Sequence, residues 1–121
     1  MIDTERLWEK LYPAAWKLAR SAAPIHDRIG EAFRGFRDLK GEEFAPDSRI
    51  LYNDIVTRMT HAGAVADGHG GIATGAVANT LATMSQPEAC EIAENIFKLF
   101  VEVAEDHFDC KPRGVDSARR R

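Results

Sequence analysis

The segment over residues 85–108 most constrains the fold, because it predicts a long helix that is apolar around much of its circumference. It begins with Ser85-Gln86-Pro87-Glu88, a capping box with a proline in the first turn. One broad apolar face follows at helical spacing: Ala89, Ile92, Ala93, Ile96, Leu99, Phe100 and Val103, extended by Phe97, Val101, Ala104 and Phe108. The remaining polar strip is narrow: Glu91, Glu94, Lys98, Glu102 and Glu105. A helix of this kind is normally central to a bundle, so the pattern predicts that other helices or a partner cover it.

Four earlier segments also show helical periodicity, and none shows the alternation of a strand. They cover about residues 4–19, 24–39, 47–66 and 72–84. Pro13 lies inside the first segment and lacks a backbone N–H, so we expect it to kink or divide that helix. The sequence therefore predicts an all-α fold, a compact bundle of four to five helices with short loops.

The size of the chain fits one domain. It has 121 residues, of which 45% are apolar and 29% charged, as in ordinary globular domains. We expect a single helical-bundle domain over residues 1–108 and a flexible basic tail over residues 109–121. The tail holds five basic and two acidic residues, a charge of +3. The rest of the chain, which we call the body, holds eleven basic and seventeen acidic residues, a charge of −6, and the net charge is −3. Contact with nucleic acid is therefore expected only through the tail.

The beginning of the sequence favours a cytoplasmic location. It lacks the basic start and apolar run of a signal peptide. No apolar stretch approaches the roughly 20 residues needed to cross a bilayer, so no membrane contact is expected. Cys90 and Cys110 would lie about 30 Å apart on one helix, too far for a disulfide. Cys90 is predicted to be a thiol packed in the core.

Candidate metal ligands surround the turn after the third predicted helix: Asp54, His61, Asp67 and His69. Asp54 and His61 lie seven residues apart and share a helix face, with Arg58 between them. Carboxylate and imidazole groups suit a divalent metal such as zinc, iron or manganese. The spacing matches no established metal motif, so the alternative is a surface ion pair between Asp54 and Arg58 with two unconnected histidines.

The same turn could bind an anion. Gly68, Gly70 and Gly71 precede a predicted helix, and the free N–H groups at a helix N-terminus can hold phosphate. No Gly-Lys-Ser/Thr follows, so the segment is not a P-loop. The three glycines also suit a tight reversal between packed helices.

Large apolar side chains mark a candidate interface. They are Trp8, Tyr12 and Trp16 in the first predicted helix, and Phe97, Val101 and Phe108 in the last. Bulky aromatic residues are typical anchors of cores and interfaces. For so small a chain, the apolar excess of the last helix favours a homo-oligomer.

Two functional hypotheses follow. The first is a small cytosolic helical interaction protein that self-associates and acts as an adaptor, regulator or inhibitor of a larger protein, with no cofactor and no catalytic residues. The alternative is a metal- or phosphate-dependent enzyme, with a divalent metal at the glycine-rich turn. No known family is recognised from these residues.

Overall fold

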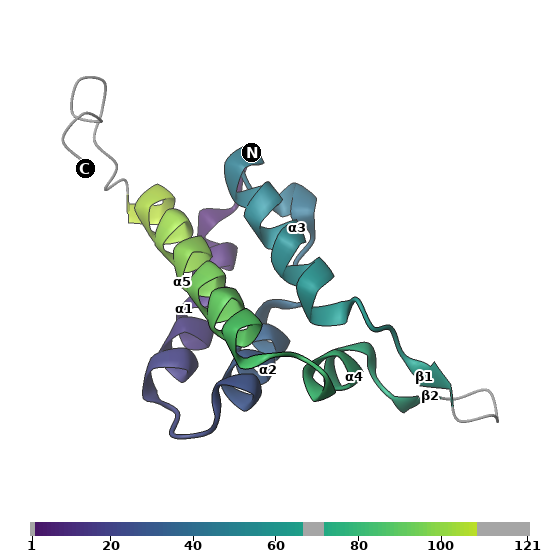
Figure 1. The fold of residues 1–121 in the computed structure, drawn as a ribbon. Helices are drawn as coiled ribbons and strands as arrows, with labels where there is room; N and C mark the ends of the chain where they lie inside the picture. The colour runs from purple at the N-terminus through teal and green to yellow at the C-terminus, as the bar shows by residue number, and fades with distance from the viewer. Residues whose placement is uncertain (1, 67–71, 109–121) are drawn as a thin grey trace.

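The computed structural model describes residues 2–66 and 72–108. This part of the chain contains five α-helices: α1 (Thr4–Arg20), α2 (Ile25–Phe36), α3 (Pro46–Thr60), α4 (Ala76–Ala82) and α5 (Gln86–Phe108), with a short 3-10 turn, η1 (Gly41–Glu43). The predicted all-α bundle is thus confirmed. α5 crosses the middle of the molecule and packs against α1, α2 and α3, while α4 packs against α2 and α3 (Figure 1).

The start and the buried face of α5 agree with the sequence. The backbone N–H of Glu88 donates to the Ser85 hydroxyl at 3.2 Å, which forms the predicted cap. The residues that α5 buries in the core are Ala89, Ile92, Ile96, Leu99 and Val103. The prediction of a core thiol is wrong, because Cys90 is exposed. Successive helical residues are turned by about 100°, so Cys90 faces away from the buried stripe that starts at Ala89.

α1 runs without a break through Pro13, so the helix is not divided there. Asp3 caps it by accepting a hydrogen bond from the Arg6 N–H at 3.1 Å. Pro13 is exposed, whereas Leu7, Leu11 and Ala14 are buried. Because these apolar contacts lie before and after the proline, they hold both halves against the core and offset the missing backbone hydrogen bond.

Tyr52 ties α3 to the segment that follows α2. It is 3% exposed, and its hydroxyl donates to the carbonyl of Leu39. The ring of Phe44 stacks on it with centroids 4.6 Å apart. Burial raises the pKa of Tyr52 to about 12. This interaction closes the end of the core near η1.

The segment between α3 and α4 departs from the prediction. α3 ends at Thr60 rather than near Ala66, and Gly63 follows with a φ of 73°, a conformation that ends helices. Two short strands, β1 (Val65–Ala66) and β2 (Ile72–Thr74), then pair antiparallel. The expected helices over residues 47–66 and 72–84 are therefore shorter than predicted at this turn, because β1 and β2 occupy the ends where they would have met. The ribbon extends away from the helices (Figure 1).

Among the described residues, no helix is long and apolar enough to span a membrane. The basic tail over residues 109–121 lies outside the described residues, so its contact with nucleic acid stays a prediction.

Candidate functional site

Aromatic side chains from α1 and α5 form one continuous surface. We call it the aromatic face; it consists of Trp8, Tyr12, Trp16, Phe97, Phe100 and Phe108. The Trp8 ring lies 5.0 Å from that of Tyr12, and 5.4 Å and 4.8 Å from those of Phe100 and Phe108. Phe97 continues the surface, with its ring centroid 6.3 Å from that of Phe100. Because Trp8 meets the C-terminal end of α5 and Tyr12 meets Phe100, the two helices run antiparallel along this face.

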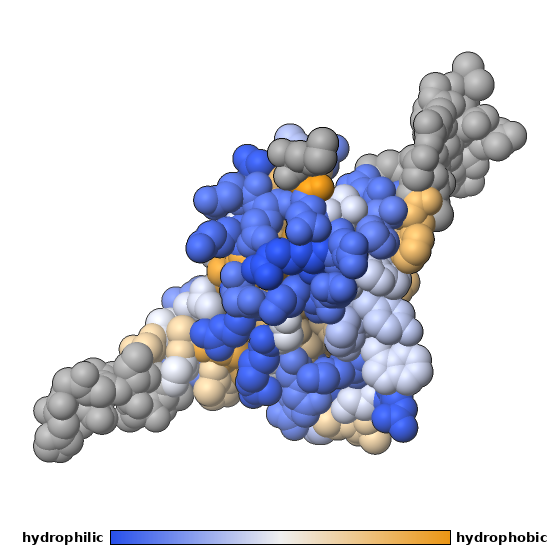
Figure 2. Space-filling view, turned by 180° about the vertical axis from the view of Figure 1, so that it is seen from behind, coloured by the Kyte–Doolittle hydropathy of each residue, from blue (hydrophilic) through white to orange (hydrophobic). Residues whose placement is uncertain are grey.

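Much of the aromatic face is open to solvent. The exposed fractions are 46% for Tyr12, 55% for Trp16, 55% for Phe97 and 54% for Phe108. The remaining predicted interface residues, Trp8 and Val101, are half-buried. The view from behind is largely hydrophilic, and apolar side chains gather at its edge near the C-terminal end of α5 (Figure 2). Exposed aromatic side chains gathered on one face mark a surface suited to binding.

A hollow and a set of charges complete this surface. Tyr12, Pro13 and Trp16 line a hollow of about 210 Å³, which can receive a protruding side chain. The helical period places Glu5, Glu9 and Arg20 on the same side of α1 as Tyr12 and Trp16. These three charged side chains make no hydrogen bond or ion pair with any other described residue. The aromatic face thus has unpaired acidic groups at one end of α1 and a basic group at the other.

Two of the four predicted metal ligands, Asp54 and His61, lie among the described residues. Asp54 lies 3.8 Å from Arg58, whose guanidinium also contacts Glu91 at 2.7 Å and Glu88 at 3.6 Å. These carboxylates raise the pKa of Arg58, and the network links α3 to α5. His61 is exposed, and its ring nitrogen lies 3.4 Å from the Arg58 carbonyl.

No group of three or more His, Cys, Asp or Glu in the described part of the chain could hold a metal. Asp67, His69 and the glycines Gly68, Gly70 and Gly71 lie outside the described residues. Their convergence with Asp54 and His61 on a metal or an anion therefore stays a prediction.

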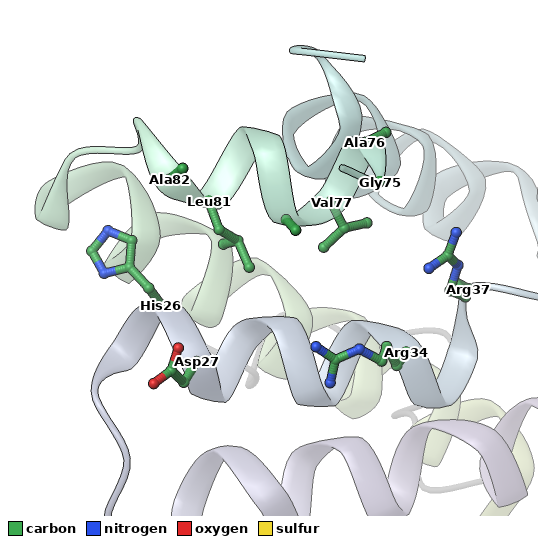
Figure 3. A pocket seen from close by; sticks show the side chains of 10 residues that line it. His26, Asp27, Arg34, Arg37, Gly75, Ala76, Val77, Leu81 and Ala82 are labelled. Carbon is green, nitrogen blue, oxygen red and sulfur yellow. The ribbon is translucent and has the colours of Figure 1, made fainter. Parts of the chain in front are cut away.

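A second surface, which the sequence reading missed, is a groove between α2 and α4 of about 490 Å³. α2 and the residue after it contribute His26, Asp27, Arg34 and Arg37, while Gly75 and α4 contribute small and apolar residues (Figure 3). Nε2 of His26 lies 2.8 Å from the Met84 carbonyl. Because a carbonyl only accepts, this nitrogen is the N–H donor. The hydrogen bond fixes the ring at one end of the groove. The sequence signal that could have indicated this groove is the spacing of Arg34 and Arg37, which lie about one helical turn apart at the end of α2.

Comparison with known proteins assigns no family to this chain. No protein-family model, no curated protein and no solved structure matches it significantly. The aromatic face and the α2–α4 groove are therefore the features from which its function is inferred.

Proposed function

We propose that this protein is a small helical interaction protein that self-associates through the aromatic face and serves as an adaptor, regulator or inhibitor of a larger protein. The observation that carries the proposal is the half-exposure of Tyr12, Trp16, Phe97 and Phe108 on one continuous surface. Fully burying a large apolar side chain is worth about 1.5–3 kcal/mol. Completing the burial of each of these residues would therefore stabilise a complex by roughly 1 kcal/mol.

The charges beside the aromatic face favour a second copy of the chain as the occupant. In a two-fold symmetric dimer, the same surface of each copy meets the other. With the two-fold axis perpendicular to α1, the α1 helices of the two copies run in opposite directions. Such a pairing places Arg20 of one copy near Glu5 and Glu9 of the other. The three groups have no partners among the described residues of their own chain, so the dimer would pair them.

The remaining surface suits a basic partner. The body of the chain carries a charge of −6, and complementary charge speeds and orients association. We therefore propose that the self-associated protein presents its acidic surface to a basic region of the larger protein.

Sedimentation equilibrium of variants tests the self-association. Replacing Trp16 or Phe97 by Ala should weaken the dimer about tenfold or more, because each substitution removes two buried rings from a symmetric interface. Ile50→Ala is the matched control: Ile50 is 71% exposed but lies on α3, outside the aromatic face. If both aromatic variants associate as strongly as the control, the proposal is wrong.

Charge reversal tests the pairing direction. Arg20→Glu should weaken association, and so should Glu9→Arg. Combining the two changes should restore much of the affinity, because opposite charges again face each other. Purely additive losses would contradict the antiparallel arrangement.

A further inference from the structure

The α2–α4 groove combines two cationic side chains with an apolar wall. Val77 and Leu81 project from α4 towards α2, Arg37 stands at one end, and His26 and Asp27 stand at the other (Figure 3). We propose that this groove binds a small organic phosphate, with the phosphate group held by Arg34 and Arg37 and the apolar body of the ligand against α4. This site is separate from the proposed self-association.

The two arginines lack the hydrogen-bonded partners that four of the five other arginines in the described part of the chain have. Arg34 forms no hydrogen bond or ion pair with another described residue. The guanidinium of Arg37 lies 6.0 Å from the centroid of the Phe33 ring, a contact that leaves its charge intact. By contrast, hydrogen bonds to carboxylate or carbonyl oxygens engage four other arginines: Arg6, Arg28, Arg49 and Arg58.

Few carboxylates compensate this charge. Asp27 lines the groove on the side towards which Arg34 points in Figure 3, but the two form no ion pair, and they lie seven residues apart, about 10 Å along the helix. Glu31 is closer in sequence, but it neither lines the groove nor forms an ion pair with Arg34. Within an acidic body, the part of the groove lined by Arg34 and Arg37 is therefore a local positive site that attracts anions.

Small residues shape the groove between the two helices. Gly30 on α2 faces α4, and a Cβ there would lie 3.0 Å from Cδ1 of Leu81. The missing side chain lets Leu81 pack directly on α2. Ala76, Ala78 and Ala82 line the groove without filling it. The resulting volume of about 490 Å³ is within the range of small-molecule sites.

The arrangement favours a phosphate ester over a carboxylate. One guanidinium can satisfy a carboxylate with a two-pronged pair of hydrogen bonds. A phosphate monoester has three terminal oxygens and can accept from two guanidinium groups at once. Arg34 on α2 and Arg37, the residue after its last turn, are three residues apart and so lie on the same side of the helix. Their guanidinium groups lie apart in Figure 3, and because both side chains are exposed they can rotate to meet one phosphate. The apolar side chains of α4 then favour a ligand with a hydrophobic body.

NMR titration of the full chain with phenyl phosphate tests the proposal. Inorganic phosphate, which lacks the ring, and benzyl alcohol, which lacks the phosphate, are titrated for comparison and are called partial ligands. We expect saturable shifts in the backbone amides of α2 and α4, with phenyl phosphate binding more tightly than either partial ligand. Arg34→Ala and Arg37→Ala should each weaken phenyl phosphate binding about five- to tenfold. Lys17→Ala is the control, because it removes one positive charge from an exposed position on α1.

A steric variant separates the groove from general surface charge. Ala78 is exposed and lines the groove, so Ala78→Leu should fill it without disturbing the core. This variant should weaken phenyl phosphate binding and leave inorganic phosphate binding unchanged. The proposal is overturned if no saturable shift occurs, if the shifts map outside α2 and α4, or if both arginine variants bind like Lys17→Ala. Equal binding of phenyl phosphate and inorganic phosphate would also overturn it.

Discussion

The buried hydroxyl of Tyr52 gives a test of the core at neutral pH. Tyr52→Phe keeps the ring that stacks on Phe44 but leaves the Leu39 carbonyl without the hydroxyl that now donates to it. Loss of a partner by a buried acceptor costs about 1–3 kcal/mol. We therefore expect the variant to lower the free energy of unfolding by about 1–2 kcal/mol. In a domain of this size, each kcal/mol corresponds to roughly 4 °C in Tm.

The same substitution should change the response to alkaline pH. Burial raises the pKa of Tyr52 to about 12 in the folded protein, whereas an unfolded tyrosine ionises near pH 10. Between these values the unfolded state binds fewer protons than the folded state, so stability falls as pH rises. The raised pKa corresponds to a loss of at most about 2.7 kcal/mol. Tyr52→Phe lacks this loss, so its stability should approach that of the wild type as pH rises from about 10 towards 12.

Urea unfolding followed by circular dichroism, repeated from neutral pH to about 11, measures both effects. Tyr12→Phe is the matched control, because Tyr12 is 46% exposed and its hydroxyl forms no hydrogen bond within the described residues. The reasoning would be refuted if the difference in free energy of unfolding between wild type and Tyr52→Phe stayed constant over this pH range. It would also be refuted if Tyr12→Phe, like Tyr52→Phe, were less stable than the wild type at neutral pH and approached its stability at high pH.

Three further predictions concern the helices and their ion pairs. Ile96→Ala should destabilise the fold by about 2–5 kcal/mol, measured by urea unfolding, because Ile96 is fully buried in α5; a loss below 1 kcal/mol would contradict its core position. Ser85→Ala should cost about 1 kcal/mol by removing the cap of α5, and an unchanged Tm would argue against that cap. Hydrogen bonds from Arg6 and Lys10 lower the pKa of Glu43 and of Asp38, respectively. The stability that these carboxylates contribute should be present at neutral pH and be lost as pH falls through their lowered pKa. Acid unfolding monitored by circular dichroism should therefore begin at higher pH in Glu43→Gln than in the wild type. Identical acid-unfolding curves for the two proteins would contradict this.

The long-range periodicity of the sequence predicts the helices well, because a buried stripe is a repeated signal. The capping box at Ser85 and the apolar positions of α5 locate its start and its buried side. Single positions are less predictable. Cys90 is adjacent to buried Ala89 yet points to solvent, and Pro13 leaves α1 continuous because apolar contacts flank it.

Features that depend on tertiary contacts could not be predicted from the sequence. The end of α3 is set by Gly63 and stabilised by the Thr80 hydroxyl, which accepts from the Ala62 N–H at 3.1 Å. A contact between residues so far apart has no periodic signature. The α2–α4 groove likewise forms only when α4 packs against α2. The aromatic residues were predicted as interface anchors, but their exposure and mutual contacts required the fold.

Sedimentation equilibrium of the unmodified full chain over a wide range of concentration tests self-association most directly. A protein that pairs through the aromatic face should show an average mass that rises from 13.4 kDa towards twice that value and then levels off. A mass that remains 13.4 kDa at every concentration would contradict the proposal that the aromatic face binds a second copy of the chain.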